Sequence, residues 1–248
     1  MKPIYEPKGA AKEYGDLALN IYTGCPHKCE YCYVPGVLRK DKEVFHSCVE
    51  PRKNIVEETR KQVEREGITD KTIFLCFTCD PYPNGCDDSV TREIIHLLKD
   101  TGNHIILLTK NGVACRRDFD LLDDEDWFGI TYAGYNDGID EVPVAEPGAT
   151  SKLQRLQALK IAHDLGIKTW VSCEPVLIPE KVIELIEDAG YVDMWKVGKL
   201  NHRASDVDWA GFGTKVEISL HLASKRYGCK YMLKDALVKE MQKGDKRC

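Results

Sequence analysis

The chain alternates between short apolar segments and amphipathic segments along most of its length. The apolar segments are rich in Ile, Val, Thr and aromatic residues, which favour β-strands, and several are continuous apolar runs of the kind buried on both faces of a parallel sheet. The predicted strands are Leu17–Thr23, Thr72–Thr78, His104–Lys110, Trp127–Tyr132, Lys168–Glu174 and Val192–Gly198. Because each is followed by a helix or a long loop, we expect right-handed crossovers and a parallel sheet.

Amphipathic segments between these strands predict helices. Ser151–Leu165 carries an apolar residue at about every third position, and the following Gly166 is a helix stop. The other predicted helices are Asn54–Glu66, a helix that starts at Asp87-Asp88-Ser89, and Glu180–Ala189. The glycine and proline residues of Tyr135–Thr150 indicate a loop.

Six strand–helix units are two fewer than a closed eightfold barrel needs. The sequence therefore predicts an α/β fold, an open partial (βα)6 TIM-like barrel with a parallel sheet, over residues 1–200. Residues 201–248 are predicted to be a C-terminal extension packed on the barrel, with a helix near Thr214–Tyr227 and a strand at Lys230–Leu233. Ligands of such sheets bind beyond the carboxyl ends of the strands.

Composition narrows the class of protein. With 43% apolar residues the chain can bury a core, and it has no apolar run near the roughly 20 residues of a membrane helix. The N-terminus lacks a secretory pattern, so we expect a cytoplasmic protein with no membrane partner. A net charge of −5 argues against a dedicated duplex-binding domain, although a local basic patch can still contact nucleic acid.

Three of the 11 cysteines form the decisive motif. Cys25, Cys29 and Cys32 lie at positions i, i+4 and i+7 in the loop that leaves the first predicted strand. Closely spaced thiolates bind an iron–sulfur cluster or zinc. Three ligands leave one iron of a 4Fe–4S cluster open, whereas a structural zinc site is filled by four. The zinc alternative needs a distant fourth ligand, such as His27, His46 or Cys48.

The CxxxCxxC spacing, with Tyr31 directly before the third cysteine, resembles the motif of the radical S-adenosylmethionine (SAM) superfamily. The resemblance implies that the three cysteines bind a 4Fe–4S cluster whose open iron chelates the amino and carboxylate groups of SAM. It implies cleavage of SAM to a 5′-deoxyadenosyl radical, which abstracts hydrogen from an organic substrate. It also implies the open six-unit barrel, in agreement with the strand count, and a low-potential electron donor of the flavodoxin or ferredoxin type.

Within that superfamily, residues from about 17 to about 200 are similar to the spore photoproduct lyase and "DNA repair photolyase"-like group. The similarity is carried by Tyr31–Pro35, Phe77–Tyr82, Leu108–Asn111, Glu146–Ala149 and a helix that bears Arg155. It implies that the substrate is a nucleobase or nucleotide. The chain departs from the group because residues 201–248 show no clear basic hairpin for contacting DNA.

The same resemblance places SAM contacts at the ends of successive strands. The expected contacts are Tyr31 and Ser172 near the adenine, Cys79 and Asp80 at the amino group, Lys110 at the carboxylate, Thr131 at the ribose, and also Tyr33. An acceptor for the ammonium group and a cation for the carboxylate suit this zwitterionic ligand. Ordinary alternatives are turn chemistry for Asp80, a surface position for Lys110 and β-propensity for Thr131.

A cysteine at the end of the second barrel strand returns a hydrogen atom to the product in spore photoproduct lyase. Here Phe77 takes that position, between Cys76 and Cys79. Alternation along the strand predicts that Cys79 faces the barrel interior and that Cys76 packs on the other face, so Cys79 is the candidate donor. No role is assigned to the remaining cysteines, Cys48, Cys86, Cys115, Cys173, Cys229 and Cys248.

Three functions are open at this point. The first is radical SAM chemistry on a nucleobase or nucleotide, and the second is the same chemistry on a peptide or small metabolite. The third is a zinc- or cluster-stabilised binding protein without turnover. The sequence does not determine the oligomeric state.

Overall fold

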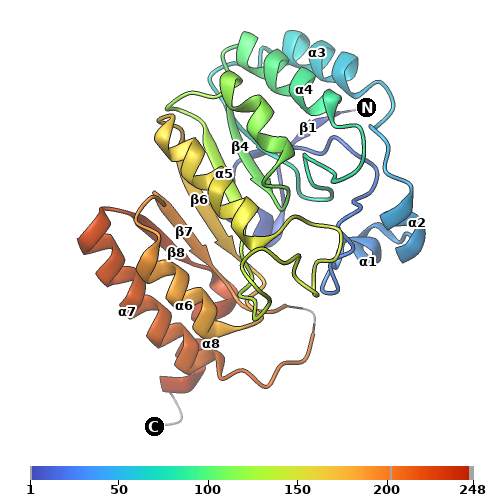
Figure 1. Ribbon diagram of the computed structural model, residues 1–248. Helices are drawn as coiled ribbons and strands as arrows, with labels where there is room; N and C mark the ends of the chain where they lie inside the picture. The colour runs from blue at the N-terminus through green and yellow to red at the C-terminus, as the bar shows by residue number, and fades with distance from the viewer. Residues whose placement is uncertain (1, 202, 246–248) are drawn as a thin grey trace.

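The computed structural model describes residues 2–201 and 203–245, and Cys248 lies outside them (Figure 1). Within these residues one eight-stranded sheet has its strands in chain order. They are β1 (Ile4–Tyr5), β2 (Leu17–Leu19), β3 (Thr72–Leu75), β4 (His104–Thr109), β5 (Trp127–Thr131), β6 (Lys168–Cys173), β7 (Met194–Val197) and β8 (Lys230–Leu233). β1 is antiparallel to β2, and all the other neighbours are parallel.

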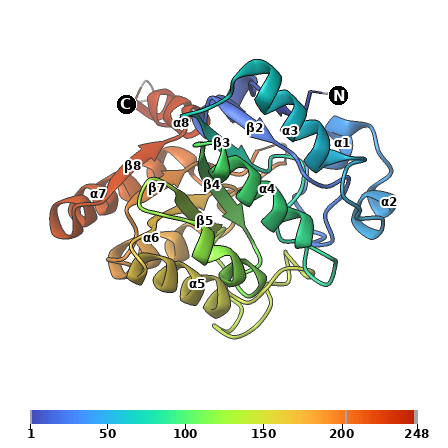
Figure 2. The ribbon, with the colours of Figure 1, turned by 90° about the horizontal axis from the view of Figure 1, so that it is seen from above.

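Helices connect the strands and cover the outer side of the curved sheet (Figure 2). They are α1 (Val34–Leu38), α2 (Lys42–Ser47), α3 (Ile55–Glu66), α4 (Ser89–Asp100), α5 (Lys152–Asp164), α6 (Pro179–Asp188), α7 (Trp209–Tyr227) and α8 (Asp235–Asp245), with 3-10 helices η1 (Gly9–Glu13) and η2 (Ala114–Leu121). None of these helices has the length and apolar character to cross a membrane within the described residues.

The six predicted strands are confirmed, and several end earlier than predicted. β2 stops at Leu19 and β3 at Leu75, before the predicted ends at Thr23 and Thr78. Beyond these points the backbone hydrogen bonds between β2 and β3 stop, and a side chain takes their place. Asn20 Oδ1 accepts hydrogen bonds from the backbone N–H groups of Phe77 (2.8 Å) and Thr78 (2.9 Å). The residues after the two strands are therefore free to turn toward the end of the barrel.

The open α/β barrel is confirmed, with β2 to β7 as its six parallel strands, and the sheet also contains β1 and β8. The strand Lys230–Leu233 is present as β8 and pairs with β7, so the segment after residue 200 adds a further parallel strand through the crossover helix α7. α7 begins at Trp209, before the predicted Thr214, because the Asp208 side chain caps it by accepting a hydrogen bond from Gly211 N at 3.1 Å. β1 has two residues, too few to show a periodic pattern.

The glycine stops after α3 and α5 are confirmed, whereas the side chain of Asp88, at the start of α4, forms no capping hydrogen bond. Ser151 caps α5 in a reciprocal capping box with Gln154. Gly67 ends α3 with a left-handed φ of 61°, and Gly166 follows α5 with a φ of 83°. Tyr135–Thr150 contains no regular element, which leaves this long loop free to lie against the site described below.

A small aromatic cluster fills the inside of the barrel. Ala18, Phe74 and Trp170 are buried together, and Trp170 Nε1 donates to Leu107 O at 2.9 Å. Gly129 makes room for the indole, since a Cβ at that position would lie 2.6 Å from Trp170 Cδ1. This cluster closes the barrel beneath its carboxyl-end cavity.

Candidate active site

A cavity of about 520 Å³ opens at the carboxyl ends of the strands. Every residue that the sequence analysis assigned to a cluster or to SAM lines it: Cys25, Cys29, Cys32, Tyr31, Tyr33, Cys79, Asp80, Lys110, Thr131 and Ser172. They lie after or at the ends of β2 to β6, where the parallel topology brings distant segments together. The structure thus unites the predicted residues in one space.

The loop Cys25–Cys32, called the cluster loop below, is held against α2 at its start. Cys25 N donates to Phe45 O at 3.1 Å, and His46 Nδ1 donates to Cys25 O at 2.7 Å. The preceding residue has to be glycine, because a Cβ on Gly24 would lie 3.0 Å from Cys48 O and still nearer to Phe45 O. These contacts fix where the first thiol enters the cavity.

The three thiols of the cluster loop are free and line the same cavity. Burial raises the pKa of Cys29 to about 12 and also raises the pKa values of Cys25 and Cys32, so a metal must displace their protons. Among the described residues, no three His, Cys, Asp or Glu side chains gather closely enough for a single metal ion. A donor set of three separated thiols fits an iron–sulfur cluster, since each thiolate there binds a different iron.

His27, His46 and Cys48 do not complete a zinc site. His27 Nε2 accepts from Asn84 N at 3.4 Å, and its Nδ1 lies 3.4 Å from Asp80 Oδ2. Burial lowers the pKa of His27 to about 4, so the ring is a neutral part of this contact. His46 is bound to the backbone of the cluster loop, and Cys48 is exposed.

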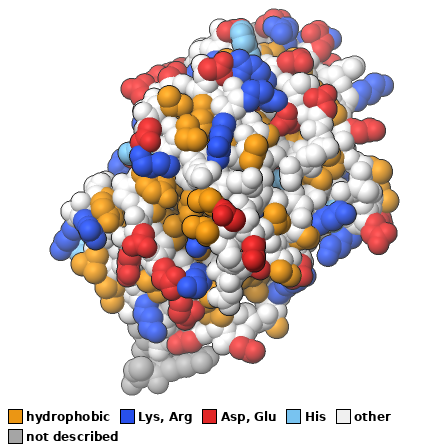
Figure 3. Space-filling view, in the orientation of Figure 1, with side chains coloured by type: hydrophobic (Ala, Val, Ile, Leu, Met, Phe, Trp, Pro, Cys, Tyr) orange, Lys and Arg blue, Asp and Glu red, His pale blue; other side chains and the backbone are white. Residues whose placement is uncertain are grey.

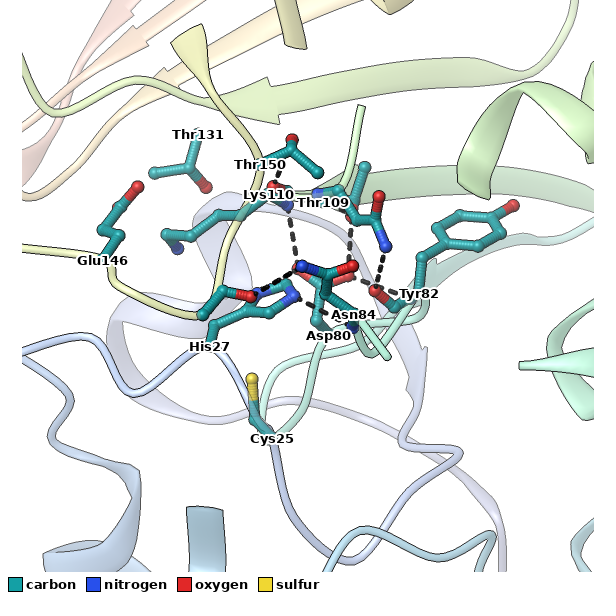
Figure 4. A network of polar contacts seen from close by, with 12 residues as sticks. Cys25, His27, Asp80, Tyr82, Asn84, Thr109, Lys110, Thr131, Glu146 and Thr150 are labelled. Atoms are coloured by element: carbon teal, nitrogen blue, oxygen red, sulfur yellow. Dashed lines mark hydrogen bonds and ion pairs between the residues drawn. The ribbon is translucent and has the colours of Figure 1, made fainter. Parts of the chain in front are cut away.

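Asp80 joins the loop after β3 to the end of β4 (Figure 4). Its carboxylate accepts hydrogen bonds from Thr109 Oγ1 at 2.6 Å, Tyr82 N at 2.9 Å and Lys110 N at 2.9 Å. The residue is 8% exposed, at the cavity surface. Asp80 therefore orders the site, and its contact with a SAM ammonium group stays a prediction.

Lys110 presents a positive charge to the cavity. Its Nζ lies 5.8 Å from the centre of the Tyr31 ring, and none of the described carboxylates pairs with it. Its backbone is fixed, because its N–H donates to Asp80 and its carbonyl accepts from Thr150 N and Oγ1 at 3.0 Å. A cation that pairs with no described carboxylate is suited to a ligand carboxylate.

Polar residues that the sequence analysis did not single out also line the cavity, at the ends of β6, β7 and β8. Glu174 Oε1 accepts from Asn201 at 2.9 Å, while Oε2 accepts from Tyr14 OH at 3.1 Å and lies 3.0 Å from Lys234 Nζ. Glu174 is the last residue of a predicted strand, and ligands bind beyond the carboxyl ends of such strands. This position could therefore have identified Glu174 from the sequence. Lys234 could be found only by knowing that β8 joins the sheet.

The prediction for Cys76 holds in part, because this residue packs in the main hydrophobic core as expected but also lines the cavity. Cys76 and Cys79 both line the cavity, because β3 ends at Leu75 and the alternation of faces ends with it. Burial raises the pKa of the Cys76 thiol. Burial also acts to raise the pKa of Cys79, but hydrogen bonds from the Cys76 thiol and from Tyr22 N lower it overall.

Comparison with known families agrees with this site. The sequence profile of the radical SAM superfamily matches residues 19–191, which is most of the chain. The chain belongs to the radical SAM superfamily. Membership implies SAM, an iron–sulfur cluster and a source of electrons. Membership argues against the alternative of a zinc- or cluster-stabilised binding protein without turnover.

Two uncharacterised proteins are relatives by sequence. ORF301 of Acidianus two-tailed virus is 26% identical over 198 residues, which cover 74% of this chain and 64% of the viral protein. MJ0683 of Methanocaldococcus jannaschii is 26% identical over 211 residues, covering 82% of this chain and 76% of the archaeal protein. The chain thus spans less than two thirds of the viral relative.

Solved structures show the same fold. Spore photoproduct lyase complexed with dinucleoside spore photoproduct superposes with a TM-score of 0.67 at 13% identity, covering 92% of this chain and 79% of that one. SuiB of Streptococcus suis bound to S-adenosylmethionine has a TM-score of 0.61 at 12% identity, covering 87% of this chain and 50% of that one.

Proposed function

We propose that Cys25, Cys29 and Cys32 bind a 4Fe–4S cluster and that SAM occupies the adjoining cavity. The observation that carries this proposal is one cavity that contains the three free thiols together with Lys110, which pairs with none of the described carboxylates. Lys110 binds the SAM carboxylate. When bound, the cluster supplies the electron that splits the SAM sulfonium to give the 5′-deoxyadenosyl radical.

The remaining lining residues orient SAM. Asp80 and Cys79 face its ammonium group, Thr131 its ribose, and Tyr31, Tyr33 and Ser172 its adenine. Thr131 and Ser172 are 3% and 1% exposed, so their hydroxyl groups lie where water cannot compete for the ligand. The electron donor in this proposal is a low-potential protein of the flavodoxin or ferredoxin type.

The substrate in our proposal is a nucleobase or nucleotide. An aromatic ring at the cavity supports it, because Phe77 lines the cavity and has Phe74 stacked on one side only, with ring centroids 4.2 Å apart. A base can stack on such a ring. On the face in Figure 3, Lys and Arg side chains are interspersed with Asp and Glu, as the acidic net charge suggests. Such a surface suits a small or already exposed base better than one that must be extruded from a duplex.

The hydrogen-atom donor is assigned to the thiols of the loop after β3. Cys79 is the donor predicted from the sequence, and the structure supports extending the assignment to the pair Cys76 and Cys79. A thiolate has no hydrogen atom to give, and the lowered pKa of Cys79 makes it the more easily deprotonated partner. Cys76 keeps its proton and lies in the same cavity.

Anaerobic reconstitution with iron and sulfide tests the cofactor assignment. The wild-type protein should become brown and, with dithionite and SAM, form 5′-deoxyadenosine. Cys29→Ala should lose both properties, because the cluster loop then keeps only two of its three thiolates. Cys48→Ala, at an exposed cysteine, is the matched control and should keep them. A Cys29→Ala protein that still forms 5′-deoxyadenosine would refute the assignment.

Deuterium transfer tests the substrate. Deuterated thymine or cytosine nucleosides and dinucleotides should pass deuterium to 5′-deoxyadenosine, and deuterated peptides or small metabolites should not. Transfer from the second group alone would contradict the nucleobase proposal and leave the cluster assignment intact. With a substrate in hand, Cys76→Ala and Cys79→Ala should retain the cluster but alter the product or uncouple SAM cleavage, and unchanged product in both would remove the donor role.

A further inference from the structure

A buried ion pair lies next to the cluster loop. Glu146 and Arg155 are both fully buried, and Arg155 Nη1 lies 2.5 Å from Glu146 Oε2. Arg155 also donates to Thr150 O, through Nε at 3.0 Å and Nη2 at 2.8 Å, and to Thr131 O at 3.3 Å. The guanidinium group therefore links Glu146 to the last residue of β5 and to the segment just before α5.

Two tyrosines donate to the two oxygens of the same carboxylate. Tyr31 OH donates to Glu146 Oε1, and Tyr135 OH donates to Oε2 at 2.8 Å. Tyr31 belongs to the cluster loop, between the second and third ligand cysteines, whereas Tyr135 belongs to the loop after β5. The ion pair thus reaches the cluster loop through one hydroxyl group.

Backbone bonds join the same turn to the cluster loop on either side of Lys28. Gly148 N donates to His27 O at 2.9 Å, and Glu30 N donates to Ala145 O at 2.9 Å. The turn fits closely, since a Cβ on Gly148 would lie 2.8 Å from His27 Cα. Residues 145–148 therefore lie along the cluster loop, and Figure 4 shows Glu146 near His27 and Lys110.

We propose that Glu146, held by Arg155, is a positioning residue that fixes the cluster loop through Tyr31 before any cluster is bound. The loop has to bring three protonated thiols to one place, and no disulfide joins its cysteines to do so. The buried anion orders the tyrosine, and the tyrosine orders the cysteines on both sides of it. The inference rests on the proposed function only in taking those cysteines as the cluster ligands.

Trypsin cleavage of the cluster-free protein after Lys28 tests this inference. Lys28 is exposed and has a left-handed φ of 53°, so cleavage there requires the loop to leave its present conformation. The Tyr31→Phe variant removes one hydroxyl group from a partly exposed side chain. The fragment beginning at Cys29 should then appear about tenfold to a hundredfold faster, because the variant loses a hydrogen bond to a charged group.

Tyr135→Phe is the matched control. It removes the other tyrosine hydroxyl group that donates to Glu146, and Tyr135 lies outside the cluster loop. It should lower the melting temperature yet leave cleavage after Lys28 within about threefold of wild type. Tyr31→Phe should instead accelerate this cleavage and leave the melting temperature close to that of wild type. The inference is overturned if Tyr31→Phe cleaves no faster than wild type or if both variants accelerate cleavage equally. Failure of iron–sulfur reconstitution in the wild-type protein would overturn the proposed function alone, since this assay needs no cluster.

Discussion

Replacing Arg155 by methionine should destabilise the protein more than any surface change. The substitution leaves Glu146 buried and ionisable without its cation, and it leaves Thr150 O without its two guanidinium donors. Breaking a buried pair by removing one partner costs about 3–5 kcal/mol. At about 2–4 °C per kcal/mol for a chain of this size, the melting temperature should fall by roughly 6–20 °C.

Thermal and urea unfolding of the cluster-free protein measure this effect, and Lys160→Met provides the control. Lys160 lies on the same helix and pairs with Asp164, but both side chains are at least half exposed, so its loss should change stability by no more than about 0.5 kcal/mol. Adding Glu146→Gln to Arg155→Met should recover part of the loss, because it removes the uncompensated charge. Equal melting temperatures for Arg155→Met and Lys160→Met would refute the claim that the ion pair supports the site.

Two further predictions concern the site and its surroundings. Gly148→Ala should reduce iron incorporation on reconstitution, because the new Cβ displaces the turn from His27. Gly36→Ala should load normally, since a Cβ at Gly36 has no atom within 4 Å. Equal iron loading of the two variants would contradict the close fit at Gly148. Burial, followed by the charge of Lys234, lowers the pKa of Lys196 to about 8, so the native protein loses this proton at lower pH than the unfolded chain does. Between about pH 8 and about 10.5 the unfolded state then binds more protons than the native state. In urea titrations the free energy of unfolding of wild type should therefore rise relative to that of Lys196→Met by up to about 1.4 kcal/mol per pH unit. A constant difference in the free energy of unfolding across that range would show that Lys196 titrates normally.

Local patterns predicted the elements and the cluster ligands. Continuous apolar runs identify β4 and β6, and the apolar period followed by Gly166 identifies α5, because these signals act over a few residues. The spacing of Cys25, Cys29 and Cys32 is likewise a local property of one loop. The resemblance to the spore photoproduct lyase group selected Lys110 and Thr131, and the parallel topology explains why these strand-end residues share a cavity with the cysteines.

Contacts between distant segments were decided only by the tertiary structure. Tyr31 and Glu146 are 115 residues apart, and Tyr14 and Ser172 are 158 residues apart, so no periodicity relates them. The direction of Cys76 depended on where β3 ends, and there Asn20, which follows β2, bonds to the backbone beyond Cys76. Sequence determines which side chains are available and where the chain turns, whereas burial and hydrogen bonding between remote strands determine which of them meet, because those free energies depend on the assembled fold.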